Sequence, residues 1–256
     1  MSIIDALILG LLQGFTEFIP ISSSGHLLLA HEILGTGENT LAFDVALHVG
    51  TLLALVLYFR KDLWNLAINV AKDNKNGRLA RILLLATIPG VVAGLLFSGY
   101  IDDNLRSPLI VAITLALVGA IMIYVDNRTV LENKHEVTRR QGVLVGVAQA
   151  FALIPGVSRS GITITTGIFL GLDRKQAARF SFLLAVPIIA GSAVGIFLKD
   201  GDSLTFGTEL YVGMTAAFVS GLIAIKFMLA FIAKIGLKPF AYYRFAVAIL
   251  VLIFLV

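Results

Sequence analysis

The chain has 256 residues, of which 58% are hydrophobic and only 14% are charged, and its formal net charge is +4 at pH 7. Soluble domains carry about 25% charged residues. The composition therefore excludes a disordered chain, a collagen-like chain and an ordinary soluble enzyme, and it indicates that lipid solvates much of the surface. Cysteine is absent, which excludes a disulfide framework, a thiolate metal site and a cysteine nucleophile.

The first apolar stretch, at 2–30, is interrupted by the segment PISSSG at 20–25. This composition does not suit a straight spanning helix, because broken backbone at membrane depth survives only where protein or a water-filled cavity satisfies its polar groups. We therefore expect a re-entrant helix–loop–helix hairpin that enters and leaves the membrane on one side. No Lys or Arg precedes Arg60, so the stretch lacks the basic start of a signal peptide and we expect it to be retained.

Six further apolar runs are long enough, or nearly so, to cross a bilayer as helices, which takes about 20 residues. These runs lie near 44–60, 80–98, 108–125, 179–198, 209–231 and 244–256. A second broken stretch, at 143–170, contains PGVSRSG at 155–161 and is predicted to form another re-entrant hairpin. The predicted fold is a single all-α transmembrane domain with six transmembrane helices and two re-entrant helix hairpins.

The basic residues predict how these helices are oriented. Of the 20 Lys and Arg residues, 16 flank spans on one side, among them Arg244 before the last span, and only Arg106 and Lys199 lie on the other side. Such an asymmetry puts the basic side in the cytoplasm. Both chain termini are then extracytoplasmic, the first hairpin enters from outside, and the second enters from the cytoplasm.

The two broken stretches align at an offset of 136 residues. Five identical pairs coincide at this offset: Gln13 with Gln149, Phe15 with Phe151, Ser22 with Ser158, Ser24 with Ser160, and Gly25 with Gly161. The same offset places the first three spans on the last three, so halves of about 1–126 and 140–256 are predicted to be repeats. Because each half crosses three times, the repeat is inverted, and such repeats place a site near the midplane where broken segments meet. We expect the site cavity there, open to the outer side.

Glu17 is the only carboxylate well inside a predicted membrane segment. An ionisable group there is costly and indicates function; the alternative is a carboxylate near the interface that only caps a helix. Gln13 lies four residues earlier and shares the same helix face. The same hairpin supplies four more polar side chains, those of Ser22, Ser23, Ser24 and His26.

In the second hairpin, Arg159 stands between Ser158 and Ser160 at a predicted helix start, with Thr163 one turn later. Helix N-termini offer unpaired N–H donors, and a guanidinium matches phosphate oxygens, so this segment is predicted to bind an oxyanion. The alternative is that Arg159 only neutralises Glu17, a pairing in the empty site that would not exclude a phosphate role.

Together these side chains suit the hydrolysis of a phosphoric anhydride. Arg159 and helix-end amides would stabilise charge on the transferring phosphoryl group. A serine hydroxyl, His26 or water would attack, with Glu17 or His26 as proton acceptor or donor, and Glu17 could instead hold a divalent cation. The sequence has no GxxxxGK[ST] loop, so a nucleotide is not expected.

Other histidines and one aspartate are weaker candidates. Asp44 and His48 lie four residues apart on one helix face, so they either line the same cavity or form an interfacial pair. His31 and His135 lie in or near loops and are predicted to be solvated.

The chain resembles the undecaprenyl-diphosphate phosphatase family, also called the bacitracin-resistance proteins, in length and hydrophobic layout over its whole length. The first family motif, [E/Q]-x-x-x-E, is formed here by Gln13 and Glu17, followed by PISSSGH. The second, PGxSRSxxT, is formed by Pro155, Gly156, Ser158, Arg159, Ser160 and Thr163.

The resemblance implies a bacterial inner-membrane enzyme that converts undecaprenyl diphosphate to the monophosphate, recycling the lipid carrier for peptidoglycan synthesis and conferring bacitracin resistance. It implies a divalent cation, Mg²⁺ or Ca²⁺, and polyprenyl diphosphate and membrane lipids as partners, without nucleic acid; a homodimer is left open. The expected site has catalytic residues Glu17, His26, Ser22 and Ser23, phosphate-binding residues Arg159, Ser158, Ser160, Thr163 and Ser24, and supporting residues Gln13, Gly25, Pro155 and Gly156.

Two other hypotheses fit parts of the pattern. Inverted repeats with broken helices also occur in transporters, so a flippase of polyprenyl phosphate, with or without phosphatase activity, is the second hypothesis. A passive channel is the third, but it leaves a lone Arg159 at membrane depth unexplained.

Overall fold

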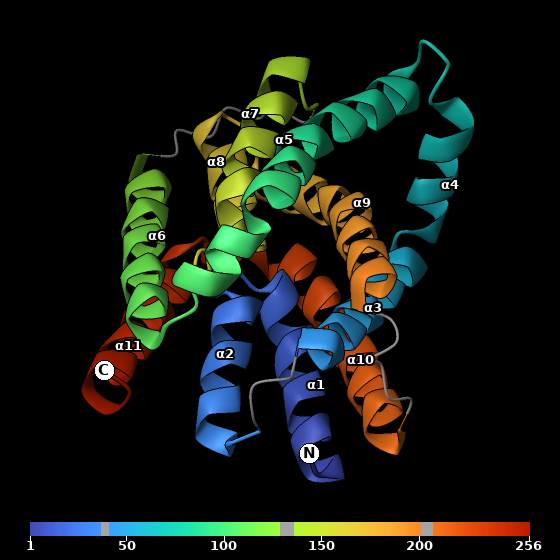
Figure 1. Ribbon diagram of the computed structural model, residues 1–256. Helices are drawn as coiled ribbons and strands as arrows, with labels where there is room; N and C mark the ends of the chain where they lie inside the picture. Colours follow the sequence, from blue (N-terminus) through green and yellow to red (C-terminus); the bar gives the residue numbers. More distant parts are fainter. Residues whose placement is uncertain (37–40, 129–135, 201–206) are drawn as a thin grey trace.

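The computed structural model describes residues 1–36, 41–128, 136–200 and 207–256, and its elements are all helices (Figure 1). In chain order they are α1 (Ile3–Phe18), α2 (Ser23–Leu34), α3 (Leu41–Tyr58), α4 (Arg60–Asn69), α5 (Lys75–Asn104), α6 (Pro108–Arg128), α7 (Arg139–Ala150), the 3₁₀ helix η1 (Phe151–Leu153), α8 (Arg159–Phe169), α9 (Arg174–Asp200), α10 (Thr208–Ile235) and α11 (Lys238–Phe254).

Both predicted helix breaks are present where the composition places them. α1 ends before Pro20 and α2 begins at Ser23, while Pro155 lies between η1 and α8. α1 packs on α2, and α7 packs on α8 (Figure 1). The interruptions at 20–25 and 155–161 are therefore confirmed, and each stretch folds back on itself as two helices.

Four described helices are long and apolar enough to cross a membrane: Lys75–Asn104, Pro108–Arg128, Arg174–Gly195 and Thr208–Ile235. A fifth crossing is reached if Phe43–Tyr58 and Arg60–Asn69, which are bent by 76°, form one broken span. The predicted run at 244–256 falls in α11, which begins earlier, at Lys238, and has 17 residues. The chain is a multi-pass helical membrane protein.

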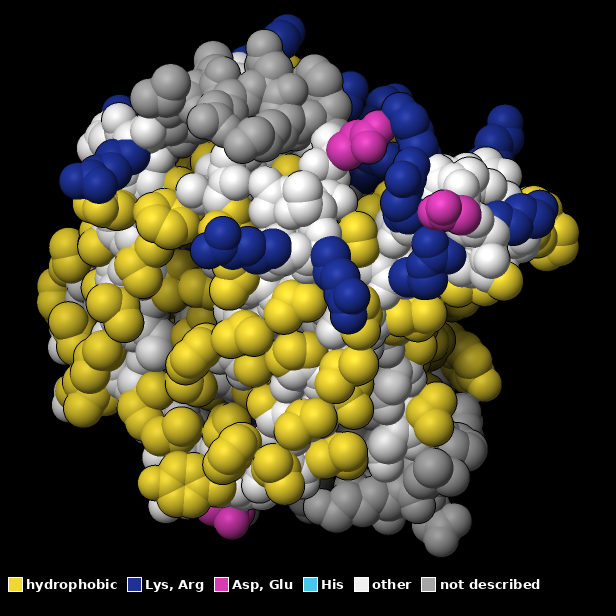
Figure 2. All heavy atoms as spheres, turned by 90° about the horizontal axis from the view of Figure 1, so that it is seen from above, with side chains coloured by type: hydrophobic (Ala, Val, Ile, Leu, Met, Phe, Trp, Pro, Cys, Tyr) yellow, Lys and Arg dark blue, Asp and Glu magenta, His cyan; other side chains and the backbone are white. Residues whose placement is uncertain are grey.

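The outer surface carries large apolar side chains that a soluble protein would bury. Leu95 is 81% exposed and Phe254 is 74% exposed. Figure 2 shows a broad apolar area beside a zone where Lys and Arg side chains gather. This distribution agrees with a surface solvated by lipid and bounded by a polar interface.

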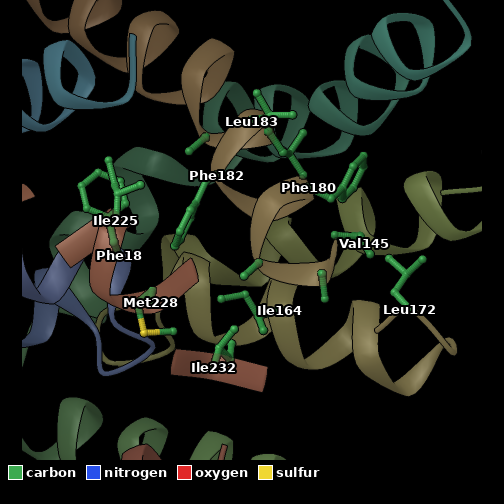
Figure 3. Packing of buried hydrophobic residues seen from close by; sticks show 14 of the residues in the cluster. Phe18, Val145, Ile164, Leu172, Phe180, Phe182, Leu183, Ile225, Met228 and Ile232 are labelled. Atoms are coloured by element: carbon green, nitrogen blue, oxygen red, sulfur yellow. The ribbon is translucent and has the colours of Figure 1, made fainter. Parts of the chain in front are cut away.

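The largest buried cluster joins helices from both ends of the chain (Figure 3). Phe18 of α1 packs edge-to-face on Phe182 of α9, with the ring centroids 5.4 Å apart. Ile164 of α8 and Ile225 of α10 belong to the same cluster. The cluster therefore fixes the end of α1 against the second half of the chain.

Small residues allow α1 and α10 to approach closely, as is typical of membrane helices. A Cβ atom on Gly14 would meet the carbonyl oxygen of Ala217 at 2.5 Å, and one on Gly10 would meet Cβ of Ala216 at 2.8 Å. This contact leaves α1 little freedom to shift, which holds Glu17 in place near its end.

Candidate active site

Each helix break ends in a serine with an unusual backbone conformation. Ser22 (φ 77°) and Ser158 (φ 73°) are the non-glycine residues with positive φ in the described ranges. Such strained positions cost about 1–3 kcal/mol and cluster at functional sites. Each serine caps the helix that follows, because Ser22 Oγ accepts from the Gly25 amide at 3.3 Å and Ser158 Oγ accepts from the Gly161 amide at 3.0 Å. The two turns thus share one local structure.

Ser24 and Ser160 hold equivalent positions in the two turns, and Ser160 also connects one turn with the other. Ser24 Oγ lies 3.4 Å from Ser22 Oγ, and Ser160 Oγ lies 3.3 Å from Ser158 Oγ. Ser160 Oγ also donates to the carbonyl of Ile19 in the first break, at 3.3 Å. The two breaks, far apart in sequence, are in direct contact.

Glu17 and Arg159 form an ion pair where the breaks meet. The Arg159 Nη2 atom donates to Glu17 Oε1 at 2.5 Å, and the two side chains are only 11% and 6% exposed. Removing one partner of such a buried pair typically costs about 3–5 kcal/mol, because the other charge stays buried without compensation. The pairing of Glu17 with Arg159 that the sequence analysis considers is therefore present.

Three more side chains surround the second carboxylate oxygen of Glu17. Oε2 accepts from Ser23 Oγ at 2.5 Å and from Gln13 Nε2 at 3.0 Å, and His48 Nε2 lies 3.6 Å away. A hydroxyl that donates to a carboxylate at this distance is within reach for proton transfer. Glu17 is therefore the centre of the cluster, and Ser23 is the hydroxyl directly paired with it.

Other residues of the second motif support the turn, and in the described part of the chain none of them forms a hydrogen bond or an ion pair with Glu17. Thr163 Oγ1 donates to the carbonyl of Arg159 at 2.7 Å and lies 2.7 Å from Ser181 Oγ. The Pro155 carbonyl accepts from Thr114 Oγ1 at 2.7 Å. Gly156 has φ 88°, and a Cβ there would meet the carbonyl oxygen of Val111 at 2.8 Å, so only glycine fits this close approach.

His26 lies beside the first turn with partners of its own. Its Nδ1 is 2.7 Å from the Ser22 carbonyl oxygen, its Nε2 is 2.9 Å from the Tyr243 hydroxyl, and its ring stacks on Tyr243. Among the described contacts it has none with Glu17 or Arg159. The predicted catalytic set thus divides into three parts. Glu17 and Ser23 are in contact, Ser22 caps α2, and His26 is held at the edge of the site.

The prediction that Arg244 flanks the last span on the cytoplasmic side is wrong. Arg244 lies inside α11 with 0% exposure, and its guanidinium donates to carbonyls of both breaks, to Pro20 at 3.3 Å and to Gly156 at 2.8 Å. It also donates to the carbonyl of Leu115 on α6 at 3.1 Å. Arg244 therefore connects the two turns with charge-assisted hydrogen bonds. The signal that would have found it is the apolar segment that already starts before it, since a lone Arg there is functional by default.

Replacement of Arg244 by Met is expected to lower the free energy of unfolding by about 3 kcal/mol or more, because several buried carbonyls lose their donor at once. Thermal unfolding of the detergent-solubilised variant measures this. Lys226→Met, at an exposed position of α10, is the matched control and should unfold close to the wild-type temperature. An Arg244→Met protein as stable as this control would contradict the connecting role.

Comparison with known proteins agrees with these two motifs. Residues 6–250 match the model of the family described as bacitracin resistance protein BacA. The chain belongs to the BacA family. Relatives named undecaprenyl-diphosphatase include one from Aliivibrio salmonicida, 46% identical over 95% of both chains, and one from Caldicellulosiruptor bescii, 44% identical over 99% of this chain and 98% of the other. A third, from Hahella chejuensis, is 44% identical over 95% of both chains.

The oxygen donors around Glu17 are of the kinds that bind a divalent cation. No cluster of three His, Cys, Asp or Glu side chains occurs in the described ranges, so a cage of protein carboxylates is not formed there. Gln13 Oε1 is buried without a hydrogen-bond partner, while the Nε2 atom of the same side chain donates to Glu17. Carboxylate, amide and hydroxyl oxygens of Glu17, Gln13 and Ser23 suit Mg²⁺ or Ca²⁺, and Mg²⁺ commonly combines one carboxylate with substrate phosphates. The donor set therefore fits a cation shared with a phosphate substrate.

The weaker candidates of the sequence analysis do not lie as predicted where the structure describes them. His31 is not solvated, because its Nε2 is 2.8 Å from Asp44 Oδ1 and its Nδ1 is 2.6 Å from Thr36 Oγ1. The Asp44 side chain therefore contacts His31, whereas the His48 side chain lies near Glu17. The two side chains of the predicted pair thus have different partners. His135 lies outside the described residues.

Proposed function

We propose that the chain is a membrane hydrolase that removes the terminal phosphate of undecaprenyl diphosphate and releases undecaprenyl phosphate. The observation that carries this proposal is the buried chain of contacts from Ser23 through Glu17 to Arg159, in a BacA-family protein whose relatives are named for this reaction. Such a cluster offers a nucleophile, a base and a phosphate ligand within one site.

Arg159 acts first as the ligand of the terminal phosphate. Its guanidinium is held by Glu17, and the incoming phosphate takes over that position because both oxyanions fit the guanidinium fork. The start of α8, where Arg159 is the first residue, adds the positive end of a helix dipole. Release of Glu17 from Arg159 leaves the carboxylate free to accept a proton.

Ser23 then attacks the terminal phosphorus. A bond forms between Ser23 Oγ and phosphorus, the hydroxyl proton passes to Glu17, and the bond from phosphorus to the bridging oxygen breaks, so that undecaprenyl phosphate leaves with the electron pair. Water then hydrolyses the phosphoserine and gives phosphate, with Glu17 handling the proton. A divalent cation bound by Glu17, Gln13 and Ser23 together with substrate oxygens would supply charge neutralisation at the phosphates.

Glu17→Gln is expected to lower kcat by about 10²–10⁴-fold, the usual contribution of a positioned base. KM should stay equal or fall, because Arg159 loses its competing carboxylate. Steady-state phosphate release by the purified protein measures both values. The control is Glu32→Gln, an exposed carboxylate on α2, which should match the wild type; a Glu17→Gln enzyme with full kcat would refute the base.

The function itself is tested with purified protein in liposomes. We expect phosphate release from a polyprenyl diphosphate and none from the monophosphate. Movement of the monophosphate lipid between leaflets without any hydrolysis of the diphosphate would support the transporter hypothesis and overturn this proposal.

We further propose six spans and two re-entrant hairpins arranged as an inverted repeat, with both termini outside a bacterial inner membrane and a midplane site open to the outside. Support comes from the helix starts: α2 at Ser23 corresponds to α8 at Arg159 at the offset of 136. In the same way α1 packs on α10 as α7 packs on α5. The strained serines at equivalent positions add a third agreement.

Because the chain has no cysteine, single cysteines report orientation directly. In spheroplasts, a membrane-impermeant maleimide should label Asp103→Cys, near the end of α5, and should label Lys72→Cys, before its start, only after lysis. Both positions are exposed. The reverse labelling pattern would invert the proposed orientation.

A further inference from the structure

A second polar site lies where α5, α7 and α9 come together. A cavity of about 920 Å³ is lined there by residues 75–85, by residues 136–139 and by residues 176–183. No residue of the two family motifs lines it. This cavity is separate from the proposed active site.

The cavity is strongly basic. Its lining includes Lys75, Arg78, Arg81, Arg139 and Arg179. Lys75 pairs with Glu136 at 2.6 Å, and Arg179 pairs with Asp62 at 2.6 Å. Arg78 and Arg139 are exposed. Lys75, and to a smaller extent Arg78, lower the pKa of the Glu136 carboxyl, so the five basic side chains outnumber the one carboxylate of the lining.

Two helix starts add to this charge. α5 begins at Lys75 and α7 begins at Arg139, and both first turns line the cavity. A helix N-terminus carries about half a positive charge and presents unpaired N–H groups. The field of the cavity therefore favours a phosphate over a neutral polar group.

The rest of the wall is apolar. Leu79 and Leu85 of α5 are half-buried and offer apolar surface, and the buried side chains of Ile82, Phe180 and Leu183 lie behind them in the lining. A free inorganic anion would gain nothing from this wall, whereas a hydrocarbon chain would bury apolar surface on it. Basic pockets between membrane helices are a typical place for anionic lipid headgroups.

We propose that this cavity binds an anionic membrane lipid, with its headgroup phosphate between Arg78 and Arg139 and its upper hydrocarbon chain against Leu79 and Leu85. This proposal requires that the protein lies in a membrane, but it does not depend on the proposed hydrolysis. The site would anchor the starts of α5 and α7 to one leaflet.

The test is native mass spectrometry of the purified protein titrated with phosphatidylglycerol or phosphatidylcholine. We expect phosphatidylglycerol to bind saturably and more tightly. The double variant Arg78→Gln/Arg139→Gln should weaken its binding by about tenfold or more, since each basic residue near a membrane surface contributes about 1 kcal/mol. The control, Lys72→Gln/Arg140→Gln, removes the same charge from exposed neighbours that do not line the cavity and should bind nearly as the wild type does.

Two further arms separate the lipid from a free phosphate. Leu85→Trp fills the apolar wall and should weaken lipid binding without affecting binding of inorganic phosphate. Equal binding by the two double variants would overturn the site, and so would displacement of the lipid by millimolar inorganic phosphate with no effect of Leu85→Trp. The readout involves no catalysis, so a Glu17→Gln protein should give the same result, and failure of the hydrolase proposal would leave this one standing.

Discussion

Arg159→Ala is expected to reduce the rate of phosphate release by about 10³–10⁵-fold, the range found when an arginine that stabilises a transferring phosphoryl group is removed. The loss should appear mainly in kcat, because the guanidinium is needed most where negative charge develops on the phosphoryl oxygens. Arg159→Lys keeps the charge but loses the planar fork, so we expect an intermediate rate. Phosphate release under saturating substrate measures all three proteins.

The Arg159 variant also leaves Glu17 buried without its partner, so folding must be controlled separately. Arg174 offers a matched control, because its Nη2 donates to Asp126 Oδ1 at 2.6 Å in another partly buried pair. Arg174→Ala should lose stability in a similar way but should retain activity while folded. If both variants lost activity in proportion to their thermal stability, Arg159 would be a structural residue only.

The sequence was sufficient to locate the breaks and the two motifs. Pro20 and Pro155 with their neighbouring serines interrupt apolar runs. Because an unsatisfied backbone group in lipid is costly, such an interruption predicts a helix break that protein or water must satisfy. Glu17 and Arg159 can be predicted as site residues in the same way, since a charge at membrane depth is costly and needs a partner. The structure confirms that they are partners.

What the sequence could not supply was contact between helices distant along the chain. Arg244 follows a basic loop and was assigned to it, although it reaches the carbonyls of Pro20 and Gly156. His48 and His31 have no motif around them, and their partners depend on how α3 packs beside α1 and α2. The apolar segment around Arg244 indicates a functional residue, but its partners are backbone carbonyls, which carry no sequence signal.

Ser23→Ala is expected to lower phosphate release by about 10⁴-fold or more, as when a nucleophile is removed from a group that acts as a unit. The hydroxyl of Ser23 is the one that donates to Glu17, whereas the hydroxyl of Ser22 accepts from the Gly25 amide. Ser22→Ala should therefore cost about 1 kcal/mol of stability as a lost helix cap and leave catalysis within about tenfold of the wild type. The two neighbours separate a chemical role from a structural one.

The most direct test of the account is the rate of phosphate release by Ser23→Ala in liposomes that contain a polyprenyl diphosphate, measured beside Ser22→Ala. The account predicts that release by Ser23→Ala falls to the background of empty liposomes while Ser22→Ala continues to turn over. Release by Ser23→Ala within tenfold of the wild-type rate would contradict the attack by Ser23 and would assign the nucleophile to water or another side chain.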